Sequence, residues 1–289
     1  MVKQNAYAKI NLFLDISCLR DDGYHDIVSY MQTVSLCDEV TLERADEITV
    51  EGNPAVLPEK DLTYRAAKAF FEHTGIHGGV KITLKKNIPM QGGLGGGSAD
   101  AAAVLRGLNE LYSTGLGDDE LRSIGGTLGS DIPFCVSGGS MLAYGRGERL
   151  CKAPNLPDCG IVIAAGSHGC STPSQFAELD RLHGDFHRYT PHTDMLDRLC
   201  NAAAAHNIIG VCESLFNIFE QTDGYDPKIA HTIKATGATG VLMSGSGSSI
   251  FGIYESEDAA SKAAAELISK GRLLFSFSGF LSLAQRVPW

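Results

Sequence analysis

The sequence has no long hydrophobic run and no excess of basic residues. No apolar stretch in its 289 residues approaches the roughly 20 that a transmembrane helix requires. The formal net charge of -10 argues against a general nucleic-acid-binding surface, which needs a basic excess. Small anionic substrates are not excluded, because a few local Lys or Arg residues suffice to bind them. We therefore expect neither a membrane nor a nucleic acid as partner.

Paired cysteine motifs are also missing. The eight cysteines are scattered singly, and none forms a C-x-x-C pair, so reduced thiols are expected rather than disulfides or a zinc site. His73 and His77, like His183 and His187, have i,i+4 spacing, but no nearby Cys or carboxylate completes a ligand set, and we expect ordinary histidines. The first residues lack the apolar core and cleavage site of a signal peptide, so a cytoplasmic protein is expected.

What is present is an irregular alternation of strand and helix patterns, typical of an α/β or α+β protein. Helices are predicted at 61–75 with Gly75 as the stop, from Ser98 onward, and at 256–271 between a Ser256 cap and a Gly271 stop. The segment 167–193 is predicted to be a loop-rich substrate-binding insertion. Strands are predicted at 6–17, 39–52, 79–88, 160–166 and on both sides of a glycine turn within 240–254.

The segment NIPMQGGLGGGSADAAAVL, residues 87–105, holds five glycines within GGLGGGS between a predicted strand and a predicted helix. Ser98 is the predicted N-cap of that helix. A helix N-terminus attracts anions, and glycines let the backbone approach phosphate oxygens. The pattern is not a P-loop, because no Lys follows the glycines, and Ser98 breaks the dinucleotide fingerprint. A tight strand-to-helix turn is the alternative; the density of glycine favours phosphate binding.

The sequence also contains the segments AKINLFL, DGYH, GGLGGGSADAA, LGSDIPF, GRGE, STPSQF and LMSGSGSSIFGIY. Together they resemble the GHMP kinase superfamily, most closely its members that phosphorylate cytidine-diphosphate methylerythritol. The resemblance implies ATP-dependent phosphorylation of that substrate's 2-hydroxyl in the non-mevalonate isoprenoid route. It also implies an α+β fold of two domains, one at 1–150 similar to the second domain of ribosomal protein S5 and one at 151–289 that is ferredoxin-like.

Two residues match the catalytic positions of that superfamily. Asp131 corresponds to a carboxylate that orients or deprotonates the substrate hydroxyl, although a helix-capping Asp before Pro133 is the alternative. Lys9 corresponds to a lysine that pairs with this carboxylate and the reacting oxygen. A lysine inside an apolar strand is costly unless it is partnered, so we favour a buried ionic role over a snorkelling side chain. A neighbouring ammonium makes a carboxylate a weaker base, so we favour hydroxyl orientation with late proton transfer.

Five residues match substrate contacts. The resemblance implies that Tyr24 and His25 contact the cytidine, that Phe176 is a second aromatic wall and that Thr172 is a polar contact. Asn11 lies two residues after Lys9 and so projects from the same strand face. The alternatives are a packed loop for the DGYH segment, a core position for the Phe and a strand-edge amide for the Asn.

ATP is expected to bind along the glycine segment. Lys86 matches a residue near the nucleotide, although a solvated strand lysine explains it equally well. Mg²⁺ is expected because it neutralises phosphate oxygens; since the sequence shows no dedicated acidic cluster, the metal should sit mainly on ATP, with Ser98 or Asp131 nearby. The remaining residues expected at ATP are Pro89, Gly92, Gly93, Leu94, Gly95, Gly96, Gly97 and Ser98.

Four residues depart from the family pattern. Gln91 replaces a small residue of the loop, and Ala99 replaces a second serine. Met31 stands where an aromatic residue is often found beside the substrate, and Asp61 where an Asn often contacts adenine. Three other readings are left open: a homoserine or mevalonate kinase, a non-catalytic nucleotide-binding protein of the same fold, and a dinucleotide-dependent oxidoreductase. A monomer or weak homodimer is expected.

Overall fold

The computed structural model describes residues 1–53, 56–165, 169–184, 186, 189–269 and 276–280. The chain forms two compact units, and each consists of several segments. The first unit comprises Met1–Ala8, Leu36–Pro89 and Gly95–Gly138, and the second comprises Lys9–Ser35, Met90–Leu94 and Gly139–Trp289. A domain boundary at residue 150 stays a prediction.

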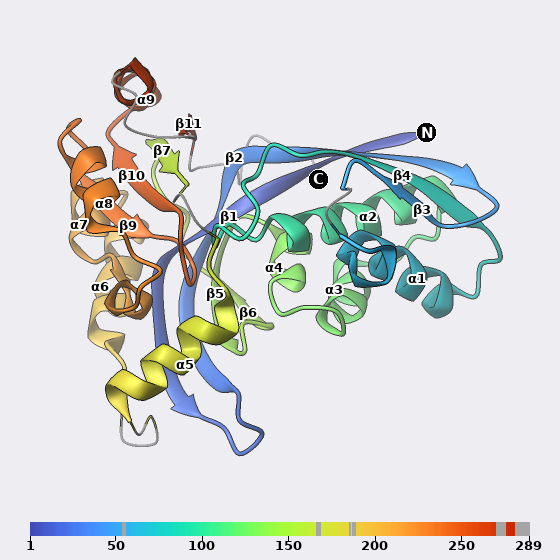
Figure 1. The fold of residues 1–289 in the computed structure, drawn as a ribbon, viewed down its shortest axis with the longest axis horizontal. Coiled ribbons are helices and arrows are strands. Elements are labelled where there is room, and N and C mark those ends of the chain that lie inside the picture. Colours follow the sequence, from blue (N-terminus) through green and yellow to red (C-terminus); the bar gives the residue numbers. More distant parts are fainter. Residues whose placement is uncertain (54–55, 166–168, 185, 187–188, 270–275, 281–289) are drawn as a thin grey trace. The chain divides into compact units, whose positions relative to one another are not determined.

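Two long strands, β1 (Val2–Leu19) and β2 (His25–Ala45), run through both units (Figure 1). Ala8, Ile10 and Leu12 alternate on one face of β1 and are fully buried, as the sequence pattern predicts. Lys9 and Asn11 point to the opposite face, and they are also buried. Polar side chains inside such a strand need partners, which makes them candidates for function.

In the first unit, helices cover a sheet that contains both antiparallel and parallel strand pairs. Strand β4 (Gly79–Lys85) pairs with residues 39–45 of β2, and β3 (Thr49–Glu51) lies parallel to β4. Helix α2 packs against α1, α3 and α4. Its small residues allow a close approach to the sheet, because a Cβ at Gly107 would collide with the Leu42 side chain. The helices are η1 (Pro58–Lys60), α1 (Leu62–Thr74), α2 (Gly96–Tyr112), α3 (Asp118–Gly126) and α4 (Ile132–Ser137).

The second unit holds strands beside β1 and β2 and a separate sheet. β5 (Ser140–Gly145) pairs with residues 27–32 of β2 and with β6 (Arg149–Lys152), and β8 (Phe216–Asn217) lies parallel to β1. The separate four-stranded antiparallel sheet has the order β11 (Ser276–Phe280), β7 (Gly160–Ala164), β10 (Ile250–Tyr254), β9 (Gly240–Met243).

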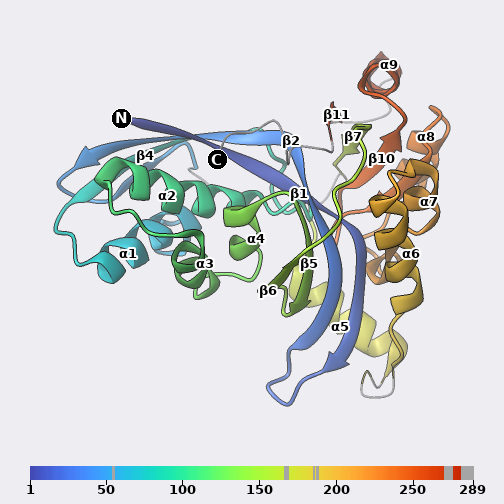
Figure 2. The same ribbon diagram turned by 180° about the vertical axis from the view of Figure 1, so that it is seen from behind.

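The helices of the second unit include two that pack on this sheet, α8 (Pro227–Lys234) and α9 (Glu257–Ser269), which Figure 2 shows from behind. The others are α5 (Thr172–His183), α6 (Thr193–Ala204), α7 (Ile208–Glu213) and η2 (Ile218–Gln221). Among the described residues, no helix is long and apolar enough to cross a membrane.

Most predicted elements are confirmed, and two are wrong. Gly75 ends α1 in the left-handed region, and the Ser256 hydroxyl accepts the Ala259 N–H near the start of α9. Gly271 lies outside the described residues. Ser98 is not an N-cap: the N-cap is Gly95, at φ +68°, and the backbone is already helical from Gly96, two residues before Ser98. The segment predicted as loop-rich, 167–193, contains α5, which buries Leu179.

Candidate functional site

The first half of the glycine segment packs against the other glycine-rich turn, residues 244–249, within the second unit. The Ser244 hydroxyl donates to the carbonyl oxygen of Gly93 at 2.9 Å, and the Ser249 N–H donates to that of Gly92 at 3.1 Å. Gly93 has φ +74°, and a Cβ there would collide with the Ser244 carbonyl oxygen. Only glycine fits this position, because any side chain would push the two backbones apart. The absence of a side chain at Gly93 therefore allows residues 92–93 to pack directly against residues 244–249.

The second half of the segment starts helix α2 in the first unit. Its N-cap, Gly95, is left-handed at φ +68°, and no side chain of the described residues caps the helix. The first turn, which includes Ser98, carries no acidic residue. Its N–H groups and the positive end of the helix dipole are therefore suited to an anion. This geometry agrees with the predicted phosphate contacts without testing them.

Lys86 lies in a buried charged cluster in the first unit. Its ammonium pairs with the carboxylates of Asp38 and Asp100, both almost fully buried. Asp38 also accepts the backbone N–H groups of Asn87 at 2.5 Å and Ile88 at 2.8 Å. The reading of Lys86 as a solvated strand lysine is therefore wrong. The cluster connects β2, the end of β4 and α2, and it fixes the backbone that enters the glycine segment.

The charges of this cluster oppose one another. Burial alone lowers the pKa of Lys86, but the neighbouring carboxylates of Asp100 and Asp38 raise it by more. The pKa of Lys86 is therefore raised overall, and the ammonium stays charged. Burial raises the pKa of Asp100 to about 7, although Lys86 acts in the opposite direction. One oxygen of Asp100, Oδ1, is buried without a hydrogen-bond partner among the described residues. The carboxyl of Asp100 therefore changes its charge near neutral pH.

Lys9 and Asn11 form a buried network in the second unit. The Lys9 ammonium donates to Asn11 Oδ1 at 2.8 Å, and the Gly245 N–H donates to the same oxygen at 3.0 Å. Asn11 Nδ2 in turn donates to the Ser29 hydroxyl at 2.9 Å. The Lys9 N–H donates to the Leu94 carbonyl oxygen at 3.0 Å. Lys9 is 5% exposed, so the buried polar role fits it and the snorkelling one does not.

Asp131 immediately precedes α4 in the first unit. Its side chain makes no capping hydrogen bond, so the structure gives no support to the capping alternative. Helices α4 and α2 pack together, and Arg106 of α2 donates to the Cys135 carbonyl oxygen at 2.7 Å. The first turn of α2, which carries Ser98, and the residue before α4 thus belong to one packed pair of helices.

The aromatic residues predicted at the cytidine lie in the second unit. His25 is buried, and its ring stacks on Phe176 with 5.0 Å between centroids and 22° between planes. Its Nε2 lies 2.8 Å from Asp180 Oδ1. Tyr24 is different: it is 58% exposed, and the Arg146 guanidinium lies 5.3 Å from its ring centroid. The structure therefore brings His25 and Phe176 together, with Tyr24 next in the chain.

Thr172 and the turn 244–249 are also joined. The Thr172 hydroxyl lies 2.9 Å from the Ser246 hydroxyl, which links the start of α5 to the turn.

Two residues that contact the predicted cytidine residues, Asp180 and Arg146, were not predicted from the sequence. Asp180 follows Phe176 by four residues, and on a helix that spacing places both on one face, so it was a usable signal. For Arg146, the GRGE match was present, but nothing in it indicated a contact with Tyr24.

The structure shows the surroundings of the four residues that depart from the family pattern. Asp61 caps α1: its carboxylate accepts the Thr63 N–H at 2.8 Å and the Asn53 amide at 2.7 Å. Gln91 adopts φ +55°, and its carbonyl oxygen accepts the Cys170 N–H at 3.2 Å. Met31 and Ala99 are buried.

The chain matches two family models. Residues 61–139 match the GHMP kinases N terminal domain, and residues 219–273 match the GHMP kinases C terminal model. The first includes the glycine segment and Asp131, and the second includes the turn 244–249.

Curated relatives cover most of the chain. A 4-diphosphocytidyl-2-C-methyl-D-erythritol kinase of Exiguobacterium sibiricum is 42% identical over 266 residues, which are 89% of this chain and 90% of the relative. The one of Acetivibrio thermocellus is 40% identical over 266 residues, covering 90% and 92%.

Solved structures agree with these matches. A crystal structure of 4-(cytidine 5'-diphospho)-2C-methyl-D-erythritol kinase has 31% identity and a TM-score of 0.74, and the match covers 97% of this chain and 99% of that one. Mevalonate kinase of L. major has a TM-score of 0.76 at 17% identity, over 98% and 96% of the two chains, which shows the shared α+β fold alone. The chain belongs to the 4-diphosphocytidyl-2-C-methyl-D-erythritol kinase family of the GHMP kinases.

Proposed function

We propose that the protein transfers the γ-phosphoryl group of ATP to the 2-hydroxyl of 4-diphosphocytidyl-2-C-methyl-D-erythritol, a step of the non-mevalonate isoprenoid route. The observation that carries this is the identity of about 40% with kinases of that name over nearly nine-tenths of the chain. The geometry supports it, because the glycine segment, the turn 244–249 and Lys9 are joined by hydrogen bonds.

The roles of the reacting groups follow from what phosphoryl transfer needs, namely positioning and charge neutralisation. We assign Asp131 to orienting the substrate hydroxyl and taking its proton late in the transfer. We assign the Lys9 ammonium to stabilising the negative charge that develops on the reacting oxygen during the transfer. Asn11 holds the ammonium of Lys9 in place, because its Oδ1 accepts from it at 2.8 Å.

ATP phosphates are assigned to the glycine segment. Its turn-facing half, Gly92–Leu94, is fixed by the contacts with residues 244–249, and its helix-facing half offers the N–H groups of the first turn of α2. Lys86 acts on this site indirectly in the proposal, since its charge is already shared between Asp38 and Asp100.

Mg²⁺ is the metal that the family implies, and the residues present fit it. The Ser98 hydroxyl and the Asp131 carboxylate are hard oxygen donors of the kind Mg²⁺ prefers. When bound, the ion neutralises the oxygens of the transferred phosphoryl group. We propose these two side chains as the ones beside it.

The cytidine end of the substrate is assigned to Tyr24, His25 and Phe176, with Thr172 as a polar contact. His25 and Phe176 stack on each other, so a pyrimidine ring can add to a π-stack that already exists. The exposed ring of Tyr24 offers a further face. Neither homoserine nor mevalonate carries a ring that such a stack would recognise.

An ADP-release assay tests the proposed function. Purified protein is given ATP and Mg²⁺ with the cytidylated substrate, homoserine or mevalonate in separate reactions. ADP release with the cytidylated substrate alone is expected. Release with homoserine or mevalonate instead would assign a different substrate, and no release with any of them from folded protein would favour a non-catalytic nucleotide-binding protein. A monomer or weak homodimer and a cytoplasmic location stay proposals.

A further inference from the structure

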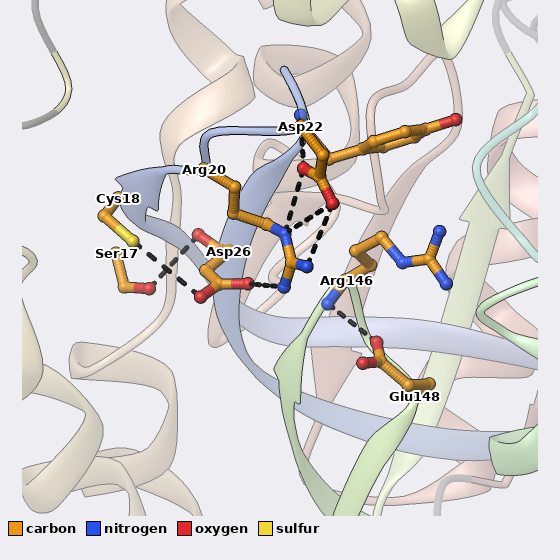
Figure 3. Close-up of polar contacts among 8 residues, drawn as sticks. Ser17, Cys18, Arg20, Asp22, Asp26, Arg146 and Glu148 are labelled. Carbon is orange, nitrogen blue, oxygen red and sulfur yellow. Dashed lines mark hydrogen bonds and ion pairs between the residues drawn. The ribbon is translucent and has the colours of Figure 1, made fainter.

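The tip of the β1–β2 hairpin, residues 20–24, is organised around one arginine (Figure 3). The Arg20 guanidinium contacts Asp22 through two nitrogens, Nε to Oδ1 at 3.1 Å and Nη2 to Oδ2 at 3.0 Å. Its third nitrogen, Nη1, contacts Asp26 Oδ1 at 3.0 Å. The two carboxylates lie on either side of Tyr24 and His25 in the chain, so one side chain spans the segment that carries both.

The contacts continue from Arg20 to the backbone of Tyr24. Asp22 Oδ1, which Arg20 holds, accepts the Tyr24 N–H at 3.1 Å. The Arg20 N–H donates to the Tyr24 carbonyl oxygen at 2.8 Å, and the Gly23 N–H donates to the Arg20 carbonyl oxygen at 3.0 Å. Both backbone polar groups of Tyr24 are therefore set by the arginine and its partner.

Asp26 receives further contacts from the end of β1. The Cys18 thiol lies 3.7 Å from Asp26 Oδ2, and the Ser17 hydroxyl donates to the Asp26 carbonyl oxygen at 3.2 Å. Asp26 is only 24% exposed in its side chain, against 49% for Asp22. Arg20 thus connects a fixed point on the strand to the exposed turn.

The ring of Tyr24 has its own partner. The Arg146 guanidinium lies over it at 5.3 Å from the centroid, a cation–π distance. The backbone N–H of Arg146 donates to Glu148 Oε2 at 2.7 Å, and this hydrogen bond fixes the turn from which the arginine projects. The Tyr24 side chain is 58% exposed, so burial does not fix its position. Its position is set by the hydrogen bonds of its own backbone and by the Arg146 guanidinium on one face of the ring.

We propose that Arg20 is a positioning residue for recognition of the cytidine nucleotide, which holds Tyr24 in its stacking position through Asp22 and Asp26 before the substrate arrives. The inference rests on the proposed function and deepens it. Pre-ordering matters because a mobile loop and its ring would otherwise be ordered at the expense of binding. A lysine cannot replace the arginine, because its single ammonium does not span two carboxylates in a planar fork.

Arg20→Ala and Arg20→Lys test the proposal. Both are expected to raise KM for the cytidylated substrate by about three- to tenfold, the cost of ordering one or two side chains on binding. KM for ATP and kcat are expected to stay within twofold. The matched control is Arg198→Ala, which removes another exposed arginine that pairs with an aspartate, Asp194, at 2.7 Å on α6. It is expected to change neither KM.

A double-mutant cycle separates positioning from general destabilisation. If Arg20 acts through Asp22, then Arg20→Ala adds little to KM in an Asp22→Asn background. An unchanged KM in Arg20→Ala, or an equal rise in KM for ATP, overturns the proposal. So does full retention of the wild-type KM by Arg20→Lys.

Calorimetric titration with cytidine diphosphate, without ATP, distinguishes failure of this inference from failure of the proposed function. Weaker binding by Arg20→Ala than by wild type supports the positioning role even if no turnover is found. Equal binding by both overturns it while the kinase assignment stands, and no binding by the wild type overturns both.

Discussion

At the scale of a single residue, the role proposed for Asp131 predicts how Asp131→Asn changes kcat and ATP binding. Asp131→Asn keeps the size of the side chain but removes the proton acceptor, so kcat is expected to fall at least about 100-fold. ATP binding, measured by calorimetry, is expected to be preserved, because the glycine segment is untouched. Asp119→Asn, on a side chain that is 89% exposed in α3, is the control and should retain wild-type kcat. A near-normal kcat for Asp131→Asn would show that the assigned role is wrong.

Gly93 provides a second residue-scale prediction, because a matched glycine exists. Gly93 and Gly115 have nearly the same φ, +74° and +69°, but a Cβ at Gly115 would meet nothing within 4 Å. Both alanine variants carry the left-handed strain of about 1 kcal/mol. Gly93→Ala must in addition push the glycine segment away from Ser244, so its KM for ATP is expected to rise at least fivefold while that of Gly115→Ala stays unchanged. Equal values for the two variants would contradict the packing of the segment.

At the scale of elements, the cluster of Lys86, Asp38 and Asp100 connects three parts of the first unit and predicts a dependence of stability on pH. The pKa of Asp100 is raised from 3.8 to about 7 in the folded protein, since burial disfavours its charge. The folded state therefore binds a proton that the unfolded state has lost between these values. This contribution to stability is complete below pH 4 and is lost as the pH rises through 7.

Asp100→Asn removes that titration and leaves the Lys86–Asp38 pair. Relative to wild type, its free energy of unfolding is expected to increase by about 1 kcal/mol per pH unit between pH 5 and 7. Urea denaturation of both proteins at several pH values measures this difference. A constant difference across the range would mean that Asp100 keeps an ordinary carboxyl pKa.

At the scale of the whole molecule, two of the matching motifs lie where the chain passes from one unit to the other. The unit boundary falls between Ala8 and Lys9 in the first motif and between Leu94 and Gly95 in the glycine segment. Of the two residues that we propose for catalysis, Lys9 belongs to the second unit and Asp131 to the first.

Metal removal is the prediction at this scale. EDTA in excess is expected to abolish ADP release, and Mg²⁺ added beyond the chelator is expected to restore it, because phosphoryl transfer depends on neutralising the phosphate charge. The melting temperature without nucleotide should be unaffected by EDTA if the ion binds mainly with ATP. A fall of that temperature would instead indicate a metal bound to the protein alone.

The sequence by itself indicated the family, strands at the positions of β1, β4, β7, β9 and β10, and helix ends at Gly75 and near Ser256, because alternation, turn residues and short motifs are local properties. It also identified Lys9 as a buried polar residue, since an ammonium in an apolar strand needs a partner. It placed the start of α2 at Ser98 instead of Gly96, because a run of glycines carries no side-chain pattern that marks the first helical residue.

The tertiary structure alone decided which residues meet. Lys86 gains Asp38 and Asp100, His25 gains Asp180, and Gly93 gains Ser244 from positions up to 155 residues away. Such partners are set by folding of the chain rather than by spacing. Pairing of buried charges and close backbone contact depend on three-dimensional distance, which no local pattern records.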